Sequence, residues 1–267
     1  MKINRSNKLD LQLNPDDGAD VNARRKLELL SSGAFLIEDD VKIKSSRNIT
    51  FMMCEAWLLG LFELKTGNYS FMRGGEQVHP KTRHFGIFYP PFAIMRVCVE
   101  DIRGHWAGMA ATIRLPEKFM AVPILFETTF TAPPKSVEQV EEILNSSYNR
   151  QSIELNPMPS LLSIQVKRLI DENYLALPSI AGIASRLGVT HAHLTRQFKS
   201  DFGLSPSAYS HQMRITDATF RLARGEEIID IAQDVGYNDL SNFYKQFRKA
   251  KAQTPGYCRA PKKRNHT

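Results

Sequence analysis

The chain has 267 residues, of which 42% are hydrophobic, a length and composition that suit two globular domains of ordinary size. Its three cysteines, Cys54, Cys98 and Cys258, are widely spaced and odd in number, which excludes a disulfide framework and favours a reducing cytoplasm. The polar start predicts no secretory signal peptide. The longest apolar run, in residues 51–62, is interrupted by Glu55 and is shorter than the ~18 residues of a membrane helix.

The charge is distributed unevenly along the chain, whose net charge is +7 with histidine neutral. Residues 160–267 contain 16 Lys and Arg against 9 Asp and Glu, whereas residues 1–159 contain 19 of each. All the excess positive charge therefore lies in the second part. This distribution favours a polyanionic partner such as nucleic acid.

Residues 1–33 are mostly polar, and we expect them to form an N-terminal arm. A turn-rich stretch, NPDDGAD, occupies residues 14–20. The basic cluster at residues 24–26 allows two interpretations, a solvated tail or an arm that contacts a ligand or the second domain.

From residue 34 to about residue 131, short apolar runs alternate with turn signals such as those at 66–68, 74–75 and 103–104. Many short strands separated by such turns indicate a jelly-roll or barrel, although residues 57–64 could instead be helical. The predicted strands are 34–37, 49–53, 57–64, 69–72, 85–89, 93–99, 109–113 and 120–126.

The histidines of this β-rich part are the first candidates for metal chemistry. Together with two carboxylates they form the set His79, His84, His105, Glu76 and Asp101. Metal sites of β-barrel enzymes gather several such ligands, but no H-x-H motif occurs here. Histidines at the surface or at the rim of the core are the simpler interpretation, so we expect no metal and no catalytic residue.

The sequence is consistent with two alternative kinds of effector pocket. Basic side chains that point inward could clamp a carboxylate or phosphate, since guanidinium donates bidentate hydrogen bonds, or they could point outward and pair with nearby acids. The basic candidates are Arg73, Lys81, Arg83, Arg96 and Arg103. An aromatic or lipid-like ligand could instead lie among Phe85, Phe88, Tyr89 and Phe92. We take Arg73, Arg83, Arg96 and Tyr89 as candidate effector-binding residues, and we expect no cofactor beyond such a small-molecule effector.

A helix is predicted after Ser136, which is a good N-cap, with Val140 and Leu144 on its apolar face. This helix could take part in dimerisation. Residues 145–160 are polar, contain two prolines and are expected to form a linker. A second amphipathic helix, predicted over 161–174, opens the C-terminal part.

Two helices joined by a glycine turn are predicted between residues 179 and 203. Ser179 precedes a short amphipathic helix that ends at Gly188, and Thr190 begins the next helix. The second helix has one apolar face, and its opposite face carries residues at i, i+3, i+4 and i+7. These exposed residues are Ala192, Thr195, Arg196 and Lys199. This arrangement is typical of a helix-turn-helix.

The same pattern recurs over residues 228–257. An apolar helix ends at Gly236, and Asn238 or Asp239 caps the next helix. The predicted inward face of that helix is Leu240, Phe243, Tyr244 and Phe247. Its polar face carries Ser241, Asn242, Lys245, Arg248 and Lys249.

The two helix-turn-helix segments form an internal repeat. Their offset is 48 residues at the glycine (236 − 188) and 49 at the phenylalanine (247 − 198), which indicates a duplicated unit. Residues 206–222, which lie between the copies, suit a helix that holds two lobes apart. Two reading helices separated by about one duplex turn, ~34 Å, can enter successive major grooves on one face of DNA.

The second copy, read as IA…GY…FYKQFRK…TPGY, resembles the signature of the AraC/XylS family of transcription regulators. The resemblance covers about residues 161–259, with one departure at Ala252, where the family usually has a glycine. It implies an α+β protein of two domains. These are a cupin-like β-barrel or jelly-roll for sensing and dimerisation at 34–144, and an all-α DNA-binding domain at 161–260 with two helix-turn-helix motifs joined by a linker helix. A basic tail follows at 261–267.

The resemblance also implies which residues contact DNA. Bases would be read by Ala192, Thr195, Arg196, Ser241, Asn242 and Lys245, and phosphates would be met by Lys199, Arg248 and Lys249. The implied function is a cytoplasmic, sequence-specific activator of transcription whose N-terminal domain senses a small molecule. Its expected partners are double-stranded DNA, RNA polymerase and a second copy bound through the N-terminal half. The alternatives are a regulator controlled by a protein partner and a cupin enzyme fused to a DNA-targeting domain.

Overall fold

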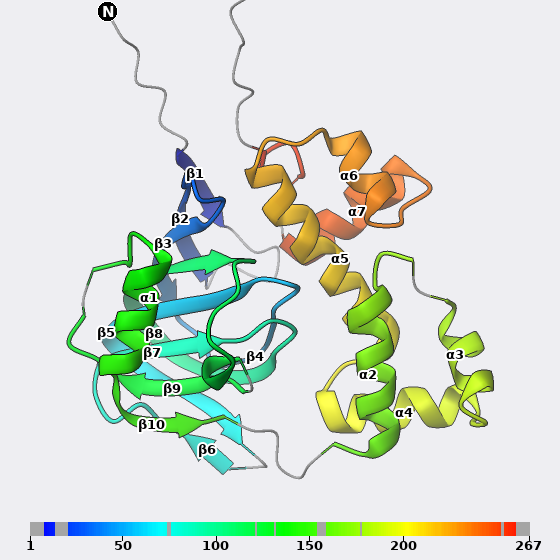
Figure 1. The fold of residues 1–267 in the computed structure, drawn as a ribbon, viewed down its shortest axis with the longest axis horizontal. Helices are drawn as coiled ribbons and strands as arrows, with labels where there is room; N and C mark the ends of the chain where they lie inside the picture. Colours follow the sequence, from blue (N-terminus) through cyan, green and yellow to red (C-terminus); the bar gives the residue numbers. More distant parts are fainter. Residues whose placement is uncertain are drawn as a thin grey trace, which may run out of the picture.

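The computed structural model describes residues 8–13, 21–73, 76–120, 122–130, 132–153, 159–176, 178–251 and 254–259. An antiparallel β part at the N-terminal side and a helical part at the C-terminal side lie next to each other (Figure 1). The expected two-part α+β organisation is confirmed. No helix within these ranges is long and apolar enough to cross a membrane.

Among the described residues, ten strands form one antiparallel sheet. Its order is β1-β2-β3-β8-β5-β7-β9-β10, with β4 beside β8 and β6 beside β5. Burial alternates along β3, because successive side chains of a strand point to opposite faces. The strands are β1 (Lys8–Leu13), β2 (Val21–Leu29), β3 (Phe35–Ile43), β4 (Arg47–Met52), β5 (Trp57–Arg73), β6 (Glu76–Val78), β7 (His84–Tyr89), β8 (Ile94–Ala111), β9 (Ile124–Glu127) and β10 (Tyr148–Ser152).

Strands β5 and β8 are longer than the sequence predicted. The breaks expected at 66–68 and 103–104 lie inside these two strands, and only the first is an irregularity. The pairing register shifts on both sides of Thr66, and Gly67 takes φ +82° there. Glycine tolerates such a bulge because it has no Cβ. The helical alternative for 57–64 is wrong, since this segment pairs with both β7 and β8.

Two segments that were expected to be irregular form strands. The arm predicted at 1–33 contains β1 and β2, and β2 pairs with β3 in a register that sets Arg24 opposite Asp40. The linker predicted at 145–160 contains β10, which pairs with β9. Neighbouring strands supply the backbone hydrogen bonds in both cases, so even a polar sequence becomes part of the ladder. The predicted turn at 14–20, the departure at Ala252 and the tail at 261–267 lie outside the described residues.

Helix α1 (Val137–Ser146) covers one face of the sheet (Figure 1). The side chain of Ser136 accepts a hydrogen bond from the backbone N–H of Gln139 at 3.4 Å, which confirms the predicted N-cap. Val140, Ile143 and Leu144 are buried in one cluster with residues of β5 and β9. The apolar face of α1 is therefore occupied by packing within the chain.

Six helices form the C-terminal part in the region that the structure covers, arranged as two lobes at the ends of α5 (Figure 1). Ser179 and Thr190 accept hydrogen bonds from backbone N–H groups three residues further on, so the predicted caps of α3 and α4 are confirmed. The helices are α2 (Leu161–Asn173), α3 (Ile180–Arg186), α4 (His191–Phe202), α5 (Pro206–Ala223), α6 (Ile228–Asp234) and α7 (Leu240–Lys251).

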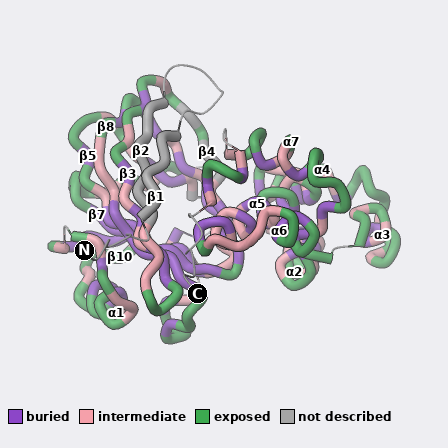
Figure 2. Tube along the Cα trace, turned by 90° about the horizontal axis from the view of Figure 1, so that it is seen from above, coloured by how far each residue is buried: buried purple, intermediate pink, exposed green. Residues whose placement is uncertain are grey.

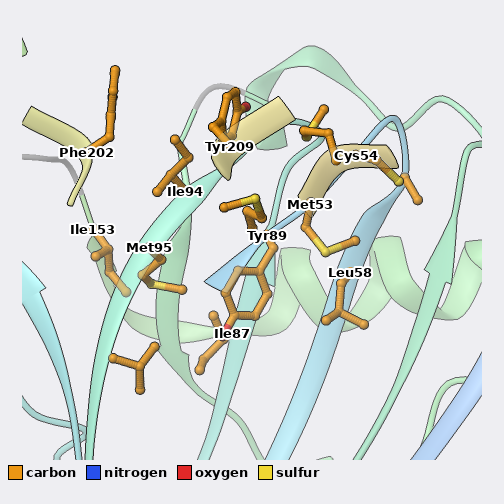
Figure 3. Close-up of a cluster of buried hydrophobic side chains, with 14 of the residues drawn as sticks. Met53, Cys54, Leu58, Ile87, Tyr89, Ile94, Met95, Ile153, Phe202 and Tyr209 are labelled. Atoms are coloured by element: carbon orange, nitrogen blue, oxygen red, sulfur yellow. The ribbon is translucent and has the colours of Figure 1, made fainter. Parts of the chain in front are cut away.

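The two lobes differ in how they connect to the β part. The first lobe, made of α2, α3, α4 and the start of α5, shares one apolar cluster with the sheet. Figure 3 shows Phe202 and Tyr209 of this lobe beside Ile94 and Met53 of the β part. The second lobe, made of α6, α7 and the end of α5, has its own cluster around Phe243, while Phe220 and Ala223 of α5 belong to the cluster shared with the sheet. Buried residues run through the strands and along α5, which connects the two lobes (Figure 2).

We call the contact surface between the β part and the helical part the seam. Arg96 on β8 donates a hydrogen bond across it to the backbone oxygen of Asp201 at 3.3 Å. The same guanidinium packs against Gly203, where an added Cβ would lie 2.8 Å from Arg96 Nε. Further along, the ring centroids of Phe35 and Phe220 are 5.3 Å apart. The seam therefore joins β3 and β8 directly to α4 and α5.

Candidate nucleic-acid interface

Helix α4 separates a buried face from a polar face, as the sequence predicted. The buried face consists of Leu194, Phe198 and Phe202. The polar face carries the exposed Ala192, Arg196 and Lys199 and the half-buried Thr195. Gly203 ends the helix at φ +84°, a conformation that glycine adopts without steric cost.

Helix α7 shows the same division, with Phe243 and Phe247 buried. Its five polar candidates are all exposed, namely Ser241, Asn242, Lys245, Arg248 and Lys249. The carboxylate of Asp239 accepts hydrogen bonds from the backbone N–H groups of Ser241 and Asn242 at 3.1 and 2.9 Å, which confirms the predicted N-cap. Leu240 was expected to point inward but is 40% exposed, because it lies in the first turn and borders an open groove on the polar face.

The basic side chains on these two faces have no carboxylate partner in the part of the chain that the structure describes. They are Arg196, Lys199, Lys245, Arg248 and Lys249. Their charge is therefore available to an external anion. Regularly spaced guanidinium and ammonium groups on an exposed helix are what phosphate and base-edge contacts require.

Arg214 on α5 ties the two lobes together. Its Nε donates to the carbonyl of Tyr174 at 2.6 Å, and its Nη1 donates to the carbonyl of Gly236 at 3.3 Å. Gly236 takes φ +81°, and a Cβ there would lie 2.5 Å from the carbonyl oxygen of Leu175. The turn of the second helix-turn-helix thus packs against the end of α2. This contact helps to set the spacing of α4 and α7, and no local sequence pattern marked Arg214 for the role.

The residues predicted to bind an effector are not brought together. Arg83 is exposed and donates to the carbonyl of Lys65 at 3.2 Å, and Arg96 lies in the seam. Tyr89 is buried inside the β part. The side chain of Arg73 lies outside the described residues. Neither Arg83 nor Arg96 lines the cavity that contains Tyr89, so these three residues do not share one pocket.

Two of the histidine candidates pair with carboxylates. His84 lies 3.7 Å from Glu63, and His105 Nδ1 lies 3.0 Å from Asp40. In the described ranges, no group of three or more His, Cys, Asp and Glu side chains is arranged to hold a metal ion.

A partly open cavity of about 210 Å³ lies in the β part. Side chains from β3, β4, β5, β7 and β8 line it, and we call it the barrel cavity. Its aromatic lining consists of Phe51, Phe62, Tyr69, Tyr89 and Trp106. Tyr89 is the predicted effector residue that lines it.

These features define a class of protein, one with a β-rich domain and a helical domain that carries two helix-turn-helix motifs with basic outer helices. Residues 183–260 match the family model described as a helix-turn-helix domain. This match and the curated relatives below identify residues 183–260 as a helix-turn-helix domain of the AraC/XylS type.

Among curated relatives, the transcriptional activator RhaS of Pectobacterium atrosepticum is 32% identical over 87 residues, 32% of this chain and 31% of that protein. The lactose operon transcription activator of Staphylococcus xylosus is 30% identical over 102 residues, 34% of this chain and 37% of that protein. The matches thus span about a third of each relative's length. The structure titled a probable AraC family transcriptional regulator from Rhodopseudomonas palustris is 22% identical, with a TM-score of 0.34, over 37% of this chain and 94% of that chain.

Proposed function

We propose that the protein is a sequence-specific DNA-binding activator of transcription whose cupin-like N-terminal domain senses a small molecule. The observation that carries this proposal is the duplicated basic face, on α4 and on α7, at the two ends of α5. With 18 residues, α5 spans about 27 Å, close to the ~34 Å between successive major grooves on one face of DNA. Its proposed partners are double-stranded DNA and RNA polymerase.

The exposed residues divide by chemistry into base readers and phosphate contacts. Arg196 is best suited to a base, since its guanidinium can bond O6 and N7 of guanine together, worth ~1–3 kcal/mol of discrimination. Asn242 is suited to adenine in the same way. Lys199 and Arg248 are suited to phosphates, which position the protein without reading sequence.

Selection from random duplex DNA tests the function as a whole. The full chain is incubated with a random pool, and the retained DNA is sequenced. We expect an enriched motif of two blocks with centres about one helical turn apart. If no sequence is enriched, the chain is not a sequence-specific regulator.

Arg196→Ala is expected to relax specificity at one base pair of the selected motif while binding to random DNA changes little. The reason is that the lost contact reads a base, worth ~1–3 kcal/mol. Affinities for the motif, its single-base variants and random DNA are measured by titration at one salt concentration. Arg168→Ala removes an exposed arginine from α2 and serves as the control. An equal loss of affinity on motif and random DNA would contradict the base-reading role.

Lys199→Ala is expected to weaken binding to all sequences and to lower the slope of log affinity against log salt by about 1. A lysine that neutralises a phosphate releases a counterion, and this release produces the slope. Binding is measured at several salt concentrations, beside Lys118→Ala, which removes an exposed lysine from the β part. An unchanged slope would argue against a phosphate contact.

One residue, Phe51, connects the barrel cavity to the contact between the β part and helices α5 and α7. Phe51 on β4 lines the cavity, with its ring centroid 4.7 Å from that of Tyr89. Phe51 also borders a groove in the seam that is shared with Ile215 of α5 and Lys251 of α7. A ligand that displaced Phe51 would change this contact and hence the placement of α7. Effector binding is therefore proposed to alter the affinity for DNA.

A further inference from the structure

The walls of the barrel cavity favour an aromatic guest. Phe62 packs close to Tyr69 and Trp106, with ring centroids 5.5 and 5.7 Å away. Phe51 and Tyr89 form a second ring pair at 4.7 Å. The remaining lining is mostly aliphatic, namely Val41, Ile43, Leu58, Leu64, Val99 and Ile102. Rings bind other rings in stacked or edge-on contacts, so this lining suits a planar apolar molecule.

The size of the cavity limits the guest to a small one. An apolar protein cavity of about 150 Å³ holds benzene. The barrel cavity, at about 210 Å³, is somewhat larger. It therefore has room for one ring with a short substituent.

The hydroxyls of Tyr69 and Tyr89 supply the polar contact. The two hydroxyls are close enough to interact with each other, and both residues line the cavity. Burial raises the pKa of both phenols above the ordinary value, so both stay protonated at neutral pH. A phenol has one O–H to donate, and one donor suffices for the bond between them. The second donor is available to an acceptor on a guest.

The described lining of the cavity gives an anionic guest no cation with which to pair. Asp39 is 2% exposed and lies in the lining. His105, also in the lining, has its Nδ1 3.0 Å from the carboxylate of Asp40. The described lining contains no lysine or arginine. A carboxylate or phosphate would therefore lose its hydration without gaining a cationic partner.

We propose that the barrel cavity binds a small, uncharged aromatic molecule with one hydrogen-bond acceptor, such as an aryl ketone or aldehyde, which accepts from the Tyr69–Tyr89 pair. This assignment rests on the proposed function, because it names the class of effector for the same site. Of the two alternatives drawn from the sequence, it replaces the anion pocket and keeps the aromatic pocket. Only Tyr89 is common to the rings expected there and the rings that line the barrel cavity.

Three probes of nearly equal shape test the assignment on the full chain. Acetophenone is neutral and has an acceptor, ethylbenzene has no acceptor, and benzoate is an anion. The chain contains 2 tryptophans, and Trp106 lines the cavity, so binding is followed by tryptophan fluorescence. We expect acetophenone to bind tightest, ethylbenzene about tenfold weaker for want of one hydrogen bond, and benzoate weakest.

The double variant Tyr69→Phe, Tyr89→Phe isolates the hydroxyl contribution. Both are changed because either phenol alone would be left with a free donor. The rings remain, so acetophenone and ethylbenzene are expected to bind this variant with equal affinity. Tyr148→Phe, Tyr257→Phe removes two hydroxyls from residues that are 47% and 48% exposed and serves as the matched control. Thermal unfolding of both variants checks that they remain folded.

Several results would overturn the assignment. These are tightest binding of benzoate, equal binding of acetophenone and ethylbenzene to the unaltered chain, no binding of any probe, or discrimination that survives in the folded double variant. DNA selection without probe is measured in parallel. A selected motif without probe binding rejects the ligand class alone, whereas probe binding without a selected motif rejects the proposed regulator and leaves the cavity as a binding site.

Discussion

Phe243→Ala is expected to unfold the second lobe while the β part and the first lobe stay folded. Phe243 is fully buried in a cluster formed by α5, α6, α7 and Cys258, separate from the cluster that the first lobe shares with the sheet. Replacing a buried phenylalanine with alanine costs about 3–5 kcal/mol. That is a large fraction of the 5–15 kcal/mol typical of a whole domain, and this lobe has only a small core of its own.

Thermal unfolding by circular dichroism and DNA selection together measure this effect. We expect an additional early transition that involves part of the helical signal, and a selected motif reduced to one block. Ile229→Ala, at a residue of α6 that is 55% exposed, is the control and should leave both unchanged. If Phe243→Ala lowers one cooperative transition of the entire chain, the two lobes share a single folding unit and the expectation is wrong.

Phe198→Ala is the matched change in the first lobe, and its expected outcome differs. Phe198 is equally buried, but its cluster continues into Ile94 and Met95 of β8. The loss of about 3–5 kcal/mol of unfolding free energy should therefore destabilise the β part as well. Tryptophan fluorescence should change for Phe198→Ala and not for Phe243→Ala, because both tryptophans of the chain, Trp57 and Trp106, lie in the sheet.

Asp217→Asn is expected to stabilise the protein at neutral pH, by up to about 2–3 kcal/mol. Asp217 lies on α5 near the seam, where burial raises the pKa of its carboxyl from 3.8 to about 6. Arg221 and Arg224 lower this pKa, whereas Glu55 of the β part and Glu226 raise it. Ionisation of Asp217 therefore destabilises the folded state, and asparagine, which does not ionise, removes this destabilisation.

The difference in stability between the Asp217→Asn variant and the unaltered protein depends on pH, because the pKa of Asp217 is raised in the folded state. The folded state holds the proton of Asp217 to a higher pH than the unfolded state does. The contribution of Asp217 to stability is therefore fully present below about pH 4 and is lost as the pH rises to about 6. Chemical denaturation of both proteins from pH 4 to pH 8 measures their free energies of unfolding. These should be equal at the acid end and differ by the full amount above pH 7.

Asp230→Asn, at an exposed carboxylate of α6, controls for the loss of one negative charge. If Asp217→Asn raises the free energy of unfolding by the same amount at every pH, then packing causes the gain in stability and ionisation does not. A loss of stability at pH 7.5 would mean that the attraction of Arg221 and Arg224 outweighs the cost of burial.

The sequence alone determined the helical part in detail. The caps at Ser179, Thr190 and Asp239 and the turn glycines Gly188 and Gly236 mark helix ends through contacts between residues at most a few positions apart. The apolar stripes of α4 and α7 have a period of 3.6 residues, which fixes the outward face, and with it the DNA-facing candidates, without knowledge of the rest of the fold.

Tertiary structure alone decided the β part, the cavity and the seam. The polar segments at 1–33 and 145–160 contain strands because partner strands were available, and the turn signals at 66–68 and 103–104 lie inside long strands. Tyr69 and Tyr89 meet across strands β5 and β7, and Arg96 meets Asp201 over 105 positions. Helix patterns arise between near neighbours in the chain, whereas sheet pairing and the packing of domains depend on residues far apart, which no local pattern encodes.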